Sequence, residues 1–109
     1  MQGQENEQEA QTYQDENNPS ELEQKHVPII EPNTVSVKVT VGEVKHPMEA
    51  NHWIQYIELF VDGESVGRVD LSPTEEPEAE FEVDVPNTKK IVAQELCNQH
   101  GLWENEINL

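Results

Sequence analysis

A strict two-residue alternation near the middle of the chain constrains the fold more than any other feature. In the stretch TVSVKVTV, valine occupies every second position, at Val35, Val37, Val39 and Val41, and polar residues occupy the positions between them. Successive side chains of a β-strand point to opposite faces, so this spacing puts all four valines on one face. The stretch is therefore expected to be a half-buried strand of an antiparallel sheet.

The same signals recur downstream. HWIQYIELFV is rich in aromatic and β-branched residues and runs into the hairpin signal DG, and SVGRVDL follows as the returning strand. EFEVDV alternates again, with Phe81, Val83 and Val85 expected to face inward. KIVAQELC tolerates helix, but it is short and lies between strand-like segments, so a strand is expected, followed by LWENEIN after Gly101. Six or seven short strands separated by turn signals predict an all-β fold, an antiparallel β-sandwich.

The N-terminal part of the chain has a different composition. Residues 1–22 contain six acidic residues, no lysine or arginine, and many Gln and Asn. Such a segment buries too little apolar surface to offset the entropy of ordering it. Residues 1–20 are therefore expected to be a disordered acidic tail, and residues 21–109 a single folded domain. The segment HVPIIEPNT, with two prolines, is expected to be an extended loop.

The charge of the chain excludes several classes of partner. The formal net charge is −17, with 23 acidic residues against six basic ones. No basic stripe is present to neutralise phosphates, so neither nucleic acid nor an anionic membrane surface is an expected partner. The sequence contains no apolar run of about 20 residues for a membrane span and no secretory signal. A single cysteine fits a reducing compartment, and the expected location is the cytoplasm.

The residues with metal-binding chemistry lie at the expected strand junctions. They are the four histidines and the only cysteine: His26, His46, His52, Cys97 and His100. Each histidine alone is more often a surface or hydrogen-bonded residue, and a lone cysteine is more often a buried structural one. Loops at one end of a sandwich can converge on one point, however, and all five residues fall in such places. The pattern therefore predicts a metal site.

The donor set indicates which metal is expected. Structural zinc prefers four tetrahedral ligands, usually richer in thiolates, so five donors are one too many. Five protein donors suit a six-coordinate ion with one open position, for which iron is the natural candidate and copper is left open. An anionic thiolate opposite the open position would promote chemistry there, as it does in thiolate-bound haem. A reactive site is therefore favoured over a sealed electron-transfer site.

Three segments together resemble a known family. The ordered combination of QKHVPII, HPMEANHWIQYIEL and CNQHGLW is similar to the iron-site signatures of the superoxide reductases, the neelaredoxin and desulfoferrodoxin group. The resemblance covers roughly residues 24–104. It implies an immunoglobulin-like β-sandwich of about seven strands, in agreement with the strand pattern, and a mononuclear non-haem iron that cycles between Fe2+ and Fe3+.

The resemblance also implies roles for individual residues. His26, His46, His52 and His100 would be the four equatorial imidazoles, and Cys97 the axial thiolate. Superoxide would be reduced by one electron to hydrogen peroxide, and an electron donor such as rubredoxin would reduce the iron again. Lys25, which matches the lysine beside the first histidine, would attract the anionic substrate and is the expected catalytic residue. Lys45, beside His46, would add to the positive field.

The chain departs from the family pattern at one position. Many members have glutamate immediately before this lysine, as a carboxylate that caps the oxidised iron, whereas this chain has Gln24 there and Glu23 one residue earlier. One hypothesis is that Glu23 moves in to replace the missing carboxylate. A single cysteine also rules out a four-cysteine rubredoxin-like domain within these 109 residues, which indicates the single-iron class. Family members form homodimers or homotetramers, and the sequence does not choose between them.

Two alternatives to superoxide reduction remain open at this point. One is the same iron site acting on peroxide or another small oxidant. The other is a non-catalytic immunoglobulin-like module with a structural or degraded metal site, which the complete set of five donors opposes.

Overall fold

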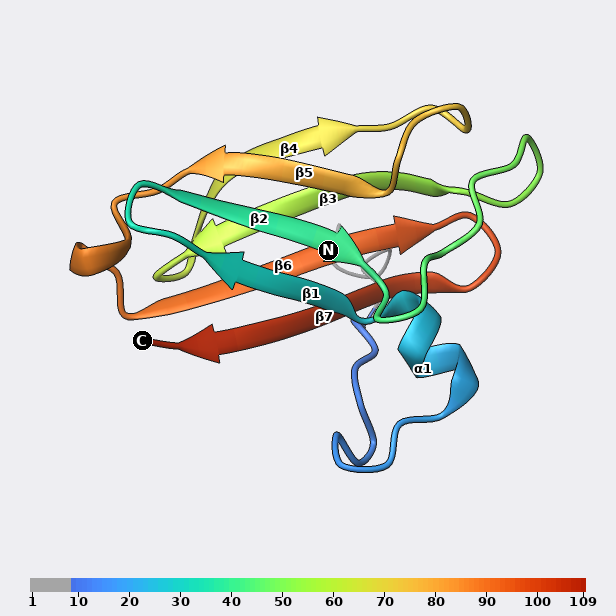
Figure 1. The fold of residues 1–109 in the computed structure, drawn as a ribbon, viewed down its shortest axis with the longest axis horizontal. Coiled ribbons are helices and arrows are strands. Elements are labelled where there is room, and N and C mark those ends of the chain that lie inside the picture. The colour runs from blue at the N-terminus through green and yellow to red at the C-terminus, as the bar shows by residue number, and fades with distance from the viewer. Residues whose placement is uncertain (1–8) are drawn as a thin grey trace, which may run out of the picture.

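Seven strands are arranged as two antiparallel sheets, and a computed structural model describes residues 9–109. The elements follow in the order α1 (Glu21–His26), β1 (Pro28–Pro32), β2 (Ser36–Val41), β3 (Ile54–Val61), β4 (Glu64–Asp70), β5 (Glu78–Glu82), a 3-10 turn (Val85–Asn87), β6 (Lys90–Cys97) and β7 (Gly101–Asn108). One sheet has the strand order β1-β2-β5 and the other has the order β4-β3-β6-β7 (Figure 1). The predicted immunoglobulin-like antiparallel β-sandwich is confirmed.

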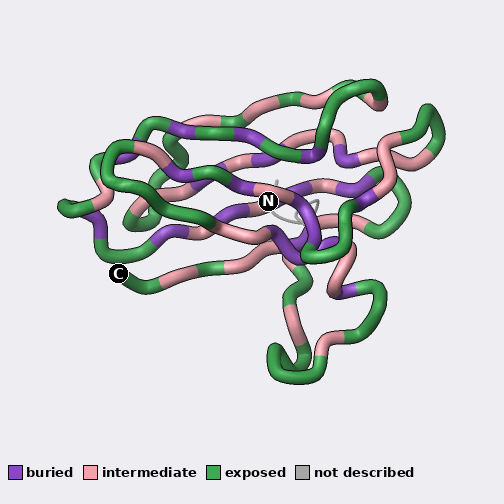
Figure 2. The backbone as a smooth tube through the Cα atoms, viewed as in Figure 1, coloured by how far each residue is buried: buried purple, intermediate pink, exposed green. Residues whose placement is uncertain are grey.

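The core lies between the two sheets and is built from alternate residues of each strand. Figure 2 shows buried and exposed positions alternating along the strands. Val37, Val39 and Val41 of β2 have no exposed surface, as the alternation predicted. Ile57 and Leu59 of the facing sheet have no exposed surface either. The prediction fails only for the first valine of the series, which lies before the start of β2 and is 72% exposed.

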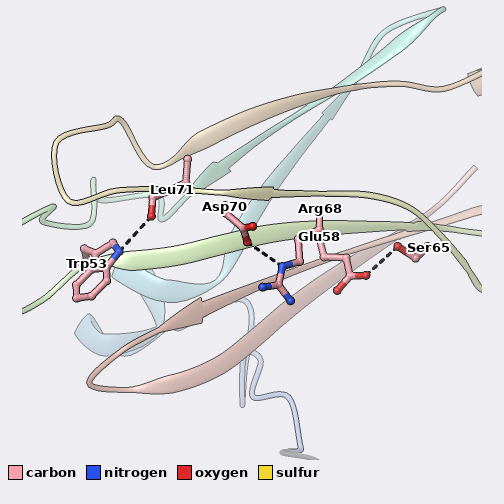
Figure 3. A network of polar contacts seen from close by, with 6 residues as sticks. All are labelled: Trp53, Glu58, Ser65, Arg68, Asp70 and Leu71. Carbon is pink, nitrogen blue, oxygen red and sulfur yellow. Dashed lines mark hydrogen bonds and ion pairs between the residues drawn. The ribbon is translucent and has the colours of Figure 1, made fainter.

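The predicted hairpin joins β3 to β4. Its turn residues, Asp62 and Gly63, have φ angles of 49° and 91°, the left-handed values that this turn requires. The outer surface of the hairpin is polar: the Ser65 hydroxyl donates to Glu58 at 2.8 Å, and an Arg68–Asp70 pair lies on β4 (Figure 3). One face of this hairpin therefore packs on the core while the other meets solvent.

Two segments near the start of the domain differ from expectation. The first residues of the expected domain form the short helix α1, which was not predicted and begins with a capping box: Ser20 accepts from the Glu23 amide, and the Glu23 carboxylate accepts from the Ser20 amide. The proline-containing segment expected to be a loop forms β1, with Pro28 and Pro32 at its two ends. Because β1 is an edge strand, these prolines cost no central ladder hydrogen bond.

Part of the expected N-terminal tail also has defined contacts. Residues 1–8 lie outside the described residues. Within residues 9–20, the Gln11 amide donates to the Leu102 carbonyl at 2.9 Å, and the Glu104 amide donates to the Gln11 carbonyl at 2.8 Å. Disorder of residues 1–20 stays a prediction from composition, and Gln11 is the point within them that pairs with the backbone of β7. Within residues 9–109, no helix has the length and apolar character to cross a membrane.

Candidate metal centre

The five predicted ligands come from four separate segments that meet at one end of the sandwich. His26 is the last residue of α1, and His46 and His52 lie in the loop between β2 and β3. Cys97 ends β6, and His100 lies in the turn that leads into β7. In Figure 1 this end is the right-hand side, where α1 packs against the sheets. The antiparallel order of the strands thus brings together residues up to 74 positions apart in sequence.

Four of the five residues bring their donor atoms into one cluster. One donor atom each from His26, His46, His52 and Cys97 lies within 4.8 Å of the others. His100 is outside this group, although its ring centroid lies 4.9 Å from that of His26 and 5.4 Å from that of His52. His100 is also exposed, whereas His26, His46 and Cys97 are buried.

The four imidazole rings form a closed cycle. Neighbouring ring centroids lie 4.6 Å apart for His26 and His46, and 4.7 Å apart for His46 and His52. The pairs that include His100 complete the cycle, and the angles between neighbouring ring planes are 79°, 79°, 64° and 77°. Four rings set edge to face around a common centre are an arrangement suited to four nitrogen donors around one ion.

Hydrogen bonds to the backbone determine which ring nitrogen faces the centre. Nδ1–H of His26 donates to the Leu22 carbonyl at 2.8 Å, and Nδ1–H of His46 donates to the Pro47 carbonyl at 2.6 Å. With the proton on Nδ1, each ring presents the lone pair of Nε2 to the interior. The two Nε2 atoms lie 3.1 Å apart, a close approach of two acceptors that a cation between them would stabilise.

The remaining donors fit the same conclusion. Two nitrogens bound at right angles to one metal, each about 2.1 Å from it, lie about 3 Å apart. Nε2 of His52 is buried without a hydrogen-bond partner, and Sγ of Cys97 lies 3.5 Å from Nε2 of His46. An unpaired buried polar atom is costly, so the unpartnered His52 nitrogen beside the other donors indicates a site built for a metal ion.

Burial keeps the ligands in the state that binds metal. It lowers the pKa of His26 and of His46 to about 4, although the backbone hydrogen bonds oppose the shift. Both rings are therefore neutral near pH 7. Burial raises the pKa of the Cys97 thiol, while the backbone amides of Gln99 and His100, which donate to the sulfur, lower it. These two amides would also stabilise a metal-bound thiolate.

Side-chain amides join the turn after Cys97 to the loop that carries His52. The Asn98 amide nitrogen donates to the Asn51 carbonyl at 3.1 Å, and the Gln99 amide nitrogen donates to the same carbonyl at 2.7 Å. On the other side of the loop, Trp53 Nε1 donates to the Leu71 carbonyl at 3.3 Å (Figure 3). The loop with His52 is therefore anchored to the turn between β6 and β7 and to the residue that follows β4.

Gly42 lets the other end of this loop pass close to α1. Its φ is +90°, and a Cβ at this position would lie 2.4 Å from the Val44 carbonyl oxygen and 2.7 Å from that of Lys25. The chain then continues to His46, while the Val44 amide donates to the Gln24 carbonyl at 3.0 Å. Any larger residue would push apart the two segments that carry the first two histidines. The positive φ could not be read from the sequence.

A cavity of about 180 Å³ opens onto the cluster. Its lining comprises Glu21, Leu22, Lys25, His26, His46, Pro47, His52 and His100. Lys25, the predicted catalytic residue, therefore borders the space in front of the histidines. Lys45 lines a neighbouring hollow and forms an ion pair with Glu76, so its charge is partly neutralised.

The two residues discussed for the missing carboxylate both point elsewhere. The Glu23 carboxylate is buried, and its two oxygens accept from the Ser20 amide at 3.0 Å and the Gln14 amide at 3.1 Å. The side-chain amide of Gln24 donates to the Pro19 carbonyl at 3.1 Å. The structure thus opposes the hypothesis that Glu23 moves to the metal. The carboxylate that lines the cavity is Glu21, which the sequence analysis did not single out.

A second acidic residue missed from sequence lies behind the site. Glu95 has no exposed surface, and neither of its carboxylate oxygens has a hydrogen-bond partner. Burial raises the pKa of its carboxyl group well above the ordinary value. Glu95 is one of the inward-facing residues of β6 and lies on the same face of the strand as Cys97. The strict alternation in KIVAQELC was the available signal.

Comparison with known proteins places this site in a family. The sequence profile described as Desulfoferrodoxin matches residues 18–106. The desulfoferrodoxin of Nitratidesulfovibrio vulgaris is 51% identical over 83 residues, which cover 76% of this chain and 63% of that protein. The superoxide reductase of Pyrococcus horikoshii is 41% identical, covering 79% of this chain and 88% of that one. The chain thus spans under two thirds of the length of the desulfoferrodoxin.

Solved structures agree with these sequence relatives. The superoxide reductase (1Fe-SOR) from Giardia intestinalis superposes with a TM-score of 0.73 at 33% identity, covering 79% of this chain and 99% of that chain. The superoxide reductase (neelaredoxin) from Ignicoccus hospitalis has a TM-score of 0.66 at 33% identity, with coverages of 77% and 79%. The matched residues include all five predicted ligands within the profile, and the chain belongs to the desulfoferrodoxin family.

Proposed function

We propose that this protein is a superoxide reductase that uses one non-haem iron held by His26, His46, His52, His100 and Cys97. The observation that carries the proposal is the closed cycle of four imidazole rings next to the Cys97 sulfur, opening onto a cavity bordered by Lys25. Ferrous iron held there would supply the one electron that, together with two protons, converts superoxide to hydrogen peroxide. Membership of the desulfoferrodoxin family supports iron over copper.

The residues around the cavity account for the choice of substrate. The cavity of about 180 Å³ has room for a small anion beside the histidines. Lys25 provides a positive charge at the mouth in a chain whose net charge is −17, so it would guide a small anion to this position against the overall repulsion. Its ammonium group is also a donor for a reduced oxygen species and a source of a proton.

Reduction of a second superoxide needs an electron from a donor protein. We propose a rubredoxin-like donor, supported by the family to which the chain belongs. Cys97 is free and buried, which suits a reducing compartment such as the cytoplasm. Dimers and tetramers remain predictions from the family resemblance.

A direct test begins with the iron-loaded, oxidised protein. A visible thiolate-to-iron charge-transfer band is expected, and it should be lost in Cys97→Ser. Pulse radiolysis should then show one-electron reduction of superoxide near the diffusional limit of about 10⁸–10⁹ M⁻¹s⁻¹, with hydrogen peroxide as product and little oxygen. Oxygen release in equal amount to peroxide would show dismutation instead.

Two other results would contradict the proposal. Fast reoxidation of the ferrous protein by hydrogen peroxide, with slow reaction with superoxide, would indicate a different oxidant. Preferential, colourless loading with zinc and no reaction with superoxide would indicate a non-catalytic metal-binding module.

A further inference from the structure

The N-terminal segment contacts two of the segments that carry predicted metal ligands. We define the strap as residues 10–19, which precede the N-cap of α1. The strap begins beside β7 and ends at α1, so it connects the turn that carries His100 with the helix that carries His26. Composition alone indicated that this segment would be disordered.

The contacts of the strap converge on one carbonyl group. Gln11 Nε2 donates to the carbonyl oxygen of His100 at 2.9 Å and to that of Leu102 at 3.3 Å. Trp103 Nε1 donates to the same His100 oxygen at 3.1 Å. The main chain of Gln11 pairs on either side of Trp103, so the side chain of Gln11 is held in place for this bond.

The other end of this network reaches a second ligand. The Trp103 indole stacks on the His26 ring, with centroids 5.1 Å apart and an angle of 27° between planes. Trp103 is 3% exposed. The carbonyl of His100 is therefore the point where the strap, the indole and two of the ligand-bearing segments are linked.

His100 is the ligand that most needs such support. It is the exposed histidine of the set, and its nitrogen lies outside the cluster formed by the other donors. Its ring has no backbone carbonyl that fixes its Nδ1 proton among the hydrogen bonds of residues 9–109, in contrast to His26 and His46. The position of the ring then depends on its main chain.

We propose that Gln11 is a positioning residue for His100 and that the strap controls how firmly the metal is retained. This inference rests on the proposed five-ligand iron site. By fixing the His100 carbonyl, Gln11 holds the turn after Cys97 in the position where the imidazole completes the cycle of rings. Loss of the donor would let this turn move and would weaken the bond to the most exposed ligand.

The test uses isosteric variants of the full chain. Gln11→Glu keeps the size of the side chain but removes the Nε2 donor, and Gln14→Glu adds the same charge three residues away. Gln14 is exposed and contributes its backbone amide, not its side chain, to the bond with Glu23. Iron release to an excess of chelator is followed from the charge-transfer band of the oxidised protein, together with its energy and the electron paramagnetic resonance spectrum.

Gln11→Glu should release iron about two- to tenfold faster, the range that one hydrogen bond supports, and should change the spectrum of the iron. Gln14→Glu should behave as wild type, and Gln11→Asn should recover little because its shorter side chain cannot reach. Equal release rates and spectra in Gln11→Glu, Gln14→Glu and wild type would overturn the role of Gln11 while leaving the iron site intact. If wild type shows no charge-transfer band, the proposed function fails instead.

Discussion

Asn98 and Trp53 pair through two hydrogen bonds in the manner of neighbouring strand residues. The side-chain oxygen Oδ1 of Asn98 accepts from the backbone amide of Trp53 at 2.9 Å. The backbone amide of Asn98 donates to the Trp53 carbonyl at 3.2 Å. Trp53 directly follows His52, and Asn98 directly follows Cys97. One side chain thus sets the distance between two ligands that are 45 residues apart in sequence.

Replacement of Asn98 by alanine should separate these two ligands. Asn98→Ala removes the side-chain bonds to the Trp53 amide and to the Asn51 carbonyl, and the expected loss of stability is about 1–3 kcal/mol. Urea unfolding of the metal-loaded protein measures it. The matched control is Asn33→Ala, at an exposed turn between β1 and β2 where the backbone amide makes the bond. A similar small loss in both variants would contradict the bridging role.

Removal of the positive charge at the cavity should slow the reaction with superoxide. Lys25→Ala takes away the cation that lines the space in front of the histidines, and a decrease of about tenfold or more in the second-order rate constant is expected. The rate should also depend less on ionic strength than in wild type. Pulse radiolysis at several salt concentrations measures both effects, and Lys89→Ala, exposed on another loop, should leave them unchanged.

Neutralisation of the negative charge at the same cavity should have the opposite effect. Glu21 lines the cavity one helical turn before Lys25, so its carboxylate repels an incoming anion. Glu21→Gln should raise the rate constant about twofold at low salt, with the difference lost at high salt. A slower reaction in this variant would show instead that the carboxylate takes part in the chemistry. The test is the same kinetic series.

The metal-free protein should lose stability as the pH falls. His26 and His46 have a pKa of about 4 in the folded state, below the ordinary value of about 6.5 in an unfolded chain. The unfolded state therefore binds more protons below about pH 6.5, and the free energy of unfolding should decline until about pH 4. Urea unfolding of the metal-free wild type and His46→Gln measures this. The difference in free energy of unfolding between wild type and His46→Gln should shrink as the pH falls. A difference that does not change with pH would contradict the lowered pKa of His46.

Glu95 should have the opposite pH dependence. Burial raises the pKa of its carboxyl group above the unfolded value of about 4.5, so its cost to the folded state grows as the pH rises from there. Glu95→Gln should therefore be more stable than wild type in alkaline solution, and the difference should close as the pH falls toward about 4.5. Glu82→Gln, at an exposed position of β5, is the control for loss of one negative charge. A difference independent of pH would indicate an unexpected partner for Glu95.

The sequence predicted the sandwich, and it predicted that the five candidate donor residues lie near one end of it. Both rest on local features, since alternation identifies a strand and its buried face, and ligand chemistry is visible in residue type. The hairpin at Asp62 and Gly63 belongs to the same class, because the φ angles that the turn requires select these residues.

The helix α1 shows what local features missed. It has six residues, too few for a hydrophobic period, although its capping box was present in the sequence as S-E-L-E. Without the helix, Glu23 is the nearest acid to Lys25. With it, residues four apart share a side, so Glu21 lines the cavity with Lys25 whereas Glu23 turns toward Ser20 and Gln14. Which of the two carboxylates lines the cavity depends on the rotation from residue to residue in the helix, and distance along the sequence does not show this.

The pairing of Gln11 with β7 has a consequence for the behaviour of the protein in concentrated solution. β7 is the outer strand of its sheet, and such strands offer their main chain to other molecules, which leads to aggregation. Gln11 of the N-terminal segment pairs with this edge at Leu102 and Glu104, and Glu106 places a negative charge further along β7. Removal of residues 1–19 would therefore expose the main chain of β7 for intermolecular strand addition. The exposed part would be the end of the sheet that carries the predicted metal ligands.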